Sequence, residues 1–178
     1  MESVYKAWLV RFEQIEQQLN ALDAVAGDGD HGTTMLTGIR AAAENTAAPA
    51  KAFRKAAGGA SGSLFSLLIG ALDKVMQGEQ ELPEALASAA TRISQMGQAV
   101  AGDKTLLDAL IPASLESTIE SSVHAARSGC ENTKPMAAKR GRAKYVEGAG
   151  VGHVDAGATS VVELLTVFSQ VYLPEKKS

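Results

Sequence analysis

The sequence predicts an all-α protein in which closely packed helices form a single domain, residues 1–178. Apolar residues recur at helical spacing along most of the chain, and no stretch combines strand alternation with hairpin turn signals. The composition agrees, because 46% of the residues are hydrophobic and only 4% are aromatic, which favours an interior of Ala, Leu and Val. A chain of 178 residues is long enough for one domain with a substantial core.

The individual helices follow from the apolar spacing. The first carries a stripe with steps of three and four residues and leads into an acidic loop. Pro83 suits the first position of a later helix. In chain order, helices are expected from Val4 to Leu22, from near Thr33, from near Ser63, from Pro83, beyond Thr105, from Ser117 to Lys139 (long or kinked), and from Ala156 to about Leu173.

Charge and cysteine content exclude several classes of protein. The net charge is -3 and no basic run is longer than the one from Lys139 to Lys144, so a nucleic-acid-binding surface has little support. The single Cys130 cannot form an internal disulfide. No signal peptide begins at Met1 and no apolar run reaches the length of a membrane span. A cytoplasmic location, with no membrane partner, is the expectation.

Three aspartates, Asp23, Asp28 and Asp30, crowd the loop between the first two expected helices. Like charges this close repel each other, and the usual relief is a raised pKa or a hard cation with oxygen ligands. An aspartate in a glycine-containing loop is, taken alone, more often a helix cap or turn former. We interpret the cluster as a Mg²⁺ site.

Glycine-rich segments precede or separate several of the expected helices. Glycine before a helix N-terminus leaves free N–H groups at the positive end of the helix dipole, which suits a phosphate group. Together with the acidic loop, these segments indicate a nucleotide phosphate site. They are Gly58–Gly62, Gly97–Thr105, Gly148–His153 and Asp155–Gly157.

Familiar phosphate and metal motifs do not fit these segments. In the Gly97–Thr105 segment, Asp103 stands between glycine and lysine where a Walker A loop allows no residue, and no strand precedes it. An EF-hand that opened at Asp28 would place Ile39 where a glutamate is required. Gly148–Gly152 has neither the spacing nor the strand of a dinucleotide fingerprint. An all-helical nucleotide site of another kind remains.

Taken together, five ordered blocks resemble the dihydroxyacetone kinase family. The resemblance is to its nucleotide-binding L subunit, or to the homologous C-terminal domain of the ATP-dependent dihydroxyacetone kinases. The blocks span nearly the whole chain, which makes the set far more specific than any one of them. They are Gly27–Thr34, Gly58–Gly62, Gly102–Thr105, Lys139–Tyr145 and Gly152–Ser160.

The resemblance implies an antiparallel barrel of eight helices with the nucleotide, ADP or ATP, at one rim. It implies that Asp23, Asp28 and Asp30 hold two Mg²⁺ ions against the nucleotide phosphates. Arg142 is expected to serve as a fixed cation and, with Asp30, to be catalytic, while Leu106 forms an apolar wall for the base. The expected nucleotide contacts are His31, Gly32, Thr33, Thr34, Ala60, Ser61, Gly97, Thr105, Leu106, Arg142, Asp155, Ala156 and Gly157.

Three functions from different classes stay open on the sequence. The first is a phosphotransferase subunit that transfers phosphate to dihydroxyacetone, or a similar small hydroxyketone, held on a substrate-binding partner subunit. The partner is expected because no segment resembles the family's substrate-binding domain. The second is a nucleotide-loaded module that regulates a partner such as a transcription regulator. The third is a metal-stabilised helical bundle without a nucleotide.

Two routes could recharge the nucleotide. It could exchange with free ATP, or it could be phosphorylated in place by a phosphohistidine protein of the sugar phosphotransferase system. A chain that begins at Met1, with its first helix close behind, favours the phosphohistidine route.

Overall fold

The structure is a computed structural model that describes residues 2–172, leaving out the side chains of Glu2, Ser3 and Arg142. All regular elements in this part of the chain are helical, which confirms the predicted all-α class. The α-helices are α1 (Glu2–Ala24), α2 (His31–Glu44), α3 (Pro49–Ala57), α4 (Gly59–Met76), α5 (Leu82–Gly97), α6 (Leu107–Ser114), α7 (Ile119–Asn132) and α8 (Ala156–Val171). A short 3₁₀ helix, η1 (Arg142–Tyr145), lies between α7 and α8.

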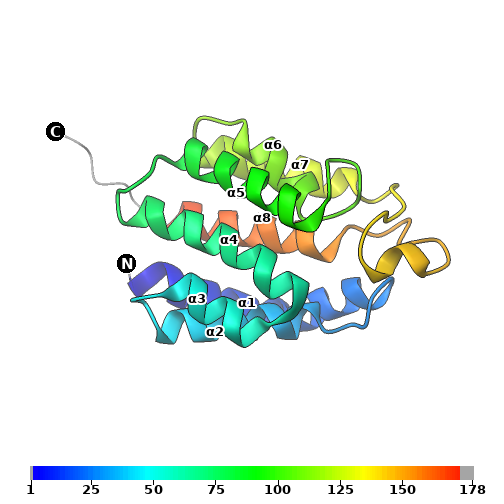
Figure 1. Cartoon of the computed structure of the whole chain (residues 1–178), viewed down its shortest axis with the longest axis horizontal. Coiled ribbons are helices and arrows are strands. Elements are labelled where there is room, and N and C mark those ends of the chain that lie inside the picture. Colours follow the sequence, from blue (N-terminus) through cyan, green and yellow to red (C-terminus); the bar gives the residue numbers. More distant parts are fainter. Residues whose placement is uncertain (1, 173–178) are drawn as a thin grey trace.

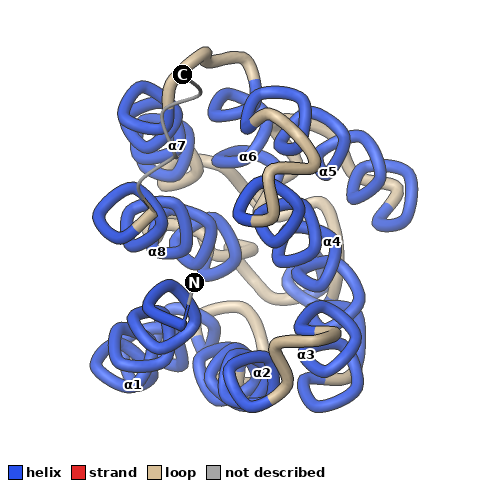
Figure 2. The backbone as a smooth tube through the Cα atoms, turned by 90° about the vertical axis from the view of Figure 1, so that its left-hand side faces the viewer, coloured by secondary structure: helices blue, strands red, loops and turns tan. Residues whose placement is uncertain are grey.

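The eight α-helices form a closed antiparallel ring. Each helix packs against the next one in the chain, and α8 returns to pack against α1, as the end-on view in Figure 2 shows. The predicted barrel of about eight helices is therefore confirmed. Because consecutive helices run in opposite directions, alternate connections meet at the same end of the barrel (Figure 1).

One rim of the barrel collects the connections α1–α2, α3–α4, α5–α6 and α7–α8, at the right of Figure 1. These connections hold the acidic loop and the glycine-rich segments that the sequence singles out. The topology therefore brings to one place motifs that are far apart along the chain.

The ring closes through contacts between the first and last helices. Trp8 is fully buried, and its Nε1 donates a hydrogen bond to the Leu164 carbonyl at 2.9 Å. Beside it, the Nε of Arg11 lies 2.7 Å from the Glu163 carboxylate. The predicted apolar stripe of α1 faces this core, and its buried members are Val4, Trp8, Phe12, Ile15 and Leu19.

The expected helix from Ser117 to Lys139 is wrong beyond Asn132. The Thr133 hydroxyl donates to the Cys130 carbonyl at 2.6 Å in the last turn of α7, and Pro135 has no N–H with which to continue the helix. Residues 133–155 instead form a long loop with η1 inside it. This loop covers part of the rim.

Other helix boundaries differ by a turn or less from expectation. Helix α2 begins at His31 and α4 at Gly59, so Gly59–Gly62 lies within the first turn of α4. The short helix α3 was not expected, because its nine residues carry few large apolar side chains. The expected end of the last helix, near Leu173, lies outside the described residues.

No helix in the described part of the chain is both long enough and apolar enough to cross a membrane.

Candidate functional site

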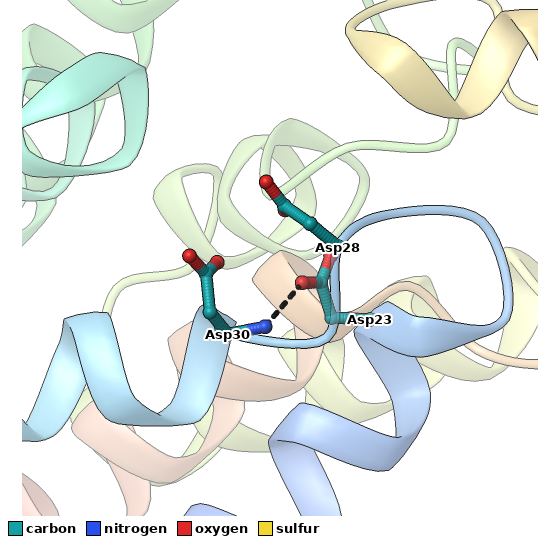
Figure 3. Close-up of side chains that lie close together, drawn as sticks. All are labelled: Asp23, Asp28 and Asp30. Carbon is teal, nitrogen blue, oxygen red and sulfur yellow. Dashed lines mark hydrogen bonds between the residues drawn. The ribbon is translucent and has the colours of Figure 1, made fainter.

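The three aspartates of the acidic loop lie together at the rim. Each offers a carboxylate oxygen, and these oxygens all lie within 4.8 Å of one another. Asp23 sits in the last turn of α1 and is half-buried, whereas Asp28 and Asp30 are exposed. Figure 3 shows the three side chains close together, with Asp30 to the left of Asp23 and the Asp28 carboxylate above it. Three oxygens at this spacing match the ligands of a hard divalent cation.

Asp23 also caps the helix that follows. Its Oδ2 accepts hydrogen bonds from the N–H groups of Gly29 (2.9 Å), Asp30 (3.0 Å) and His31 (3.3 Å). Asp30 occupies the N-cap position of α2, but its side chain makes no capping bond. The capping role considered for these aspartates therefore belongs to Asp23, and the Asp30 carboxylate remains available at the rim.

Two glycines are required by close contacts around the acidic loop. A Cβ on Gly27 would clash with the Asp23 carboxylate. A Cβ on Gly32 would collide with the Glu16 carbonyl where α2 crosses α1. These glycines hold the two helix ends close enough for the aspartates to converge.

A cleft of about 540 Å³ opens beside the acidic loop. It is lined by residues from the end of α1, the starts of α2, α4, α6 and α8, the end of α5 and the 133–155 loop. The predicted site residues that line it are Asp23, Asp28, His31, Ala60, Ser61, Gly97, Thr105, Leu106, Asp155, Ala156 and Gly157.

The remaining predicted site residues do not line the cleft. Gly32 is buried against α1, and Thr33 bonds to the same helix, its amide donating to Asn20 at 3.1 Å and its hydroxyl to Glu16 at 2.8 Å. Thr34 donates its N–H to the Asp30 carbonyl in the first turn of α2. The Asp30 carboxylate stands at the edge of the cleft with its two partners. Arg142 begins η1, and its side chain lies outside what the structure describes.

His31 joins two helices at the floor of the cleft. It is buried, and its Nε2 lies 2.8 Å from the Ser160 hydroxyl of α8. Burial lowers the pKa of His31 to about 4, so the ring is neutral at pH 7. A neutral ring offers a hydrogen bond but no positive charge to a ligand.

Asp155 caps α8 at the opposite wall of the cleft. Its Oδ2 accepts the N–H of Ala158 at 2.7 Å, and its own N–H donates to the Thr133 hydroxyl at 2.9 Å. Burial, together with the nearby Asp108, raises the pKa of Asp155 to about 6. A close approach of Leu106 to Gly157 packs the α5–α6 loop against this helix end.

Asp103 and Asp108 hold the α5–α6 loop in shape. The Asp108 carboxylate accepts the N–H groups of Gly102 (2.5 Å) and Thr105 (2.7 Å). Asp103 accepts from Arg140 at 2.9 Å, and this partner lowers the pKa of the Asp103 carboxyl. Arg140 lines the cleft, so the ion pair joins two loops of the rim.

Lys104 has a structural role in this site that the sequence does not predict. Its buried ammonium donates to four backbone carbonyls of the long loop: Thr133 (2.9 Å), Met136 (3.0 Å), Gly150 (2.8 Å) and His153 (2.6 Å). Burial lowers its pKa. The only sequence signal was its place in the Gly102–Thr105 block.

Comparisons with known proteins agree with this arrangement. A family model described as the DAK2 domain matches residues 25–170. The chain is 31% identical to L-erythrulose kinase of Pectobacterium atrosepticum, covering 86% of this chain and 31% of that protein. It is 31% identical to triokinase/FMN cyclase of Homo sapiens, covering 88% and 32%. The chain thus spans about a third of the length of these two relatives.

A third relative is similar over most of its own length. The PEP-dependent dihydroxyacetone kinase, ADP-binding subunit DhaL, of Escherichia coli is 29% identical, covering 91% of this chain and 93% of that subunit. Among solved structures, the dihydroxyacetone kinase from C. freundii in complex with AMP-PNP and Mg²⁺ matches with a TM-score of 0.73. That match has 23% identity and covers 95% of this chain and 33% of the other, and it shows the shared fold.

Proposed function

The chain belongs to the DAK2 domain family, as its five motif blocks predict, and on this premise we propose that it binds a Mg²⁺-nucleotide in the rim cleft. The observation that carries the proposal is a convergence of helix ends. Helices α2, α4, α6 and α8 all begin at the rim, and each contributes first-turn residues to the cleft lining. Four positive helix ends around one cleft form a site for a polyanion.

The acidic loop complements this arrangement. Three carboxylate oxygens within 4.8 Å of one another beside a phosphate site are a donor set suited to Mg²⁺. Two ions, as the family resemblance implies, would share Asp23, Asp28 and Asp30. When bound, Mg²⁺ supplies neutralisation of the phosphate charge.

The rest of the cleft suits a nucleoside. Leu64 of α4, Met96 of α5 and Leu106 before α6 give it apolar walls. We propose that the base lies against these side chains, while the phosphates face Ser61, Gly157 and the acidic loop. The remaining predicted contacts, Gly32 to Thr34, would then act by shaping the start of α2.

For the reaction, we propose phosphoryl transfer to a small hydroxyketone such as dihydroxyacetone. The names of the relatives, which include erythrulose kinase, triokinase and dihydroxyacetone kinase, support this substrate class. The residues of this chain position the phosphates and hold their charge, and no nucleophile from the chain is needed. Asp30 and Arg142 are the residues proposed to act closest to the transferred group.

A partner subunit is proposed to present the hydroxyketone at the rim. Five of the seven large apolar side chains that are exposed in the described residues belong to the last turn of α5 or to the connections at this rim, and exposed apolar side chains concentrated at one end favour a protein interface there. These five are Met96, Val100, Tyr145, Val146 and Val151. The other two are Val10 and Leu115.

For the phosphate donor, we propose a retained ADP that is recharged in place by a phosphohistidine protein. The name of the E. coli relative, a PEP-dependent kinase subunit that binds ADP, supports this route. Free ATP is the competing donor, because the names of the erythrulose kinases and triokinases carry no such dependence. The initial rate with each donor, at equal protein and with the same substrate-binding partner, decides between them.

The binding proposal is tested by thermal unfolding of nucleotide-free protein. Mg²⁺ with ADP should raise the Tm, because a ligand that binds only the folded state stabilises it. ADP with EDTA should raise it far less. No shift with Mg²⁺ plus ADP or ATP would overturn the proposal and leave a metal-stabilised helical bundle.

A further inference from the structure

A second hollow lies on the side of the barrel, away from the rim. It has a volume of about 280 Å³ and runs across α3, α4 and α5, sharing no residue with the nucleotide cleft. Four exposed cations line it: Lys51, Arg54, Lys74 and Arg92. We call this hollow the basic groove.

The described lining of the basic groove carries only positive charge. No aspartate or glutamate is among these lining residues, although the whole chain carries a net charge of -3. Within the described residues, none of its four cations forms an ion pair or a side-chain hydrogen bond. Other arginines among the described residues do form ion pairs, Arg11 with Glu163 and Arg40 with Glu13.

The nearby helices explain why no acid neutralises the groove. Helix α3 contains no acidic residue. The only one in α4, Asp73, accepts hydrogen bonds from the Tyr5 hydroxyl of α1 and from Gln77, both at 2.6 Å. The acidic residue of α5, Glu84, does not line the groove. Glu79 and Glu81 stand on either side of Gln80 in the chain, and neither belongs to the lining. Among the described residues, the lining therefore contains four cations and no acid.

The length of the groove along α4 suits a short extended ligand. Its α4 wall runs from Ser66 to Lys74, about 12 Å at the helical rise, which matches three to four residues of extended peptide. Its floor is made of small residues, and a Cβ on Gly70 would lie 3.3 Å from that of Ala50. Its described lining includes no aromatic side chain that could stack on a nucleic-acid base.

We propose that the basic groove is a docking site for an acidic segment of a partner protein. The ammonium and guanidinium groups hold the carboxylates of the segment, and the small floor lets its backbone lie close to α3 and α4. The proposal does not depend on the nucleotide site, which lies at the rim.

The test uses the whole chain and a fluorescein-labelled peptide of eight glutamates, followed by fluorescence anisotropy at low salt. Saturable binding is expected, and the double variant Arg54→Glu, Arg92→Glu should weaken it at least tenfold. The matched control is Lys55→Glu, Arg127→Glu, which makes the same change in net charge at exposed residues outside the groove. The control should change the affinity less than threefold.

Two further measurements keep the outcome decisive. The variants Arg54→Gln and Arg92→Gln repeat the test without charge reversal, and Tm values with and without Mg²⁺-ADP verify that each variant is folded and has an intact nucleotide site. Absent peptide binding, or equal losses in the groove and control variants, would overturn the proposal. Two other results would also overturn it. Displacement of the peptide by inorganic phosphate, at a concentration similar to that of the peptide, would identify a small-anion site. Tighter binding of a single-stranded oligonucleotide than of the peptide would identify a nucleic-acid site.

Discussion

Replacing Lys104 with methionine tests whether its ammonium holds the 133–155 loop in place. Methionine keeps most of the side-chain volume but removes the donor to the carbonyls of Thr133, Met136, Gly150 and His153. An ammonium has three protons, so it makes at most three full hydrogen bonds, each of about 1.5–3 kcal/mol. The gross loss is then about 4.5–9 kcal/mol.

Part of this loss is recovered. The variant no longer desolvates a buried charge, and carbonyls of the loop can regain water once it loosens. We therefore expect a net destabilisation of about 2–4 kcal/mol. At about 2–4 °C per kcal/mol for a domain of this size, the Tm should fall by roughly 5–15 °C.

The assay combines thermal unfolding with limited trypsin digestion. The loop carries basic cleavage sites from Lys139 to Lys144, and cleavage there should accelerate in Lys104→Met because the loop opens more often. The control is Lys134→Met, an exposed lysine of the same loop, which should change stability by less than about 0.5 kcal/mol. If Lys104→Met has the same Tm and the same resistance to trypsin as the control, the ammonium does not hold the loop in place.

Three further predictions concern the rim. Asp30→Asn should leave the Tm of the nucleotide-free protein within about 2 °C of the parent, while it removes most of the Tm increase caused by Mg²⁺-ADP. Asp23→Asn should also lower the Tm of the nucleotide-free protein, because it weakens the hydrogen bonds that three N–H groups donate to this carboxylate. An Asp30→Asn variant that keeps the full shift would remove Asp30 from the metal site. The pKa of Asp155 is raised from 3.8 to about 6, so the folded protein binds more protons in this window. Its stability should therefore fall by about 2 kcal/mol as the pH rises from 4 to 6. In urea unfolding, the stability of Asp155→Asn should fall less steeply with pH than that of the parent. Identical pH profiles of stability for the two proteins would contradict this role of Asp155. Gly32→Ala should lower the free energy of unfolding by about 1–3 kcal/mol, because the added Cβ meets the Glu16 carbonyl. The control Gly97→Ala should not destabilise the nucleotide-free protein, because an added Cβ there has no neighbour nearer than 3.8 Å. Equal unfolding midpoints of the two variants in urea would show that α1 and α2 move apart freely.

Helix positions could be predicted from the sequence because they depend on local spacing. The apolar stripe from Val4 to Leu22 identifies α1, and most residues of that stripe are buried in the core. The sequence does not reveal helix α3, because its nine residues carry few large apolar side chains. Helix α7 ends earlier than the apolar pattern predicts, because the hydrogen bond from Thr133 to the Cys130 carbonyl leaves no trace in that pattern.

The sequence by itself determined the class of fold and the chemistry of the motif blocks, because helical period and the clustering of Asp23, Asp28 and Asp30 are local properties. Only the tertiary structure decided how those blocks meet. The antiparallel ring places alternate connections at one rim, where Asp155 faces a loop of α5–α6 and His31 bonds to Ser160. Lys104 acts on carbonyls 29 to 49 residues away, and a contact of that range depends on how the helices pack. No pattern within a short stretch of sequence could have revealed it.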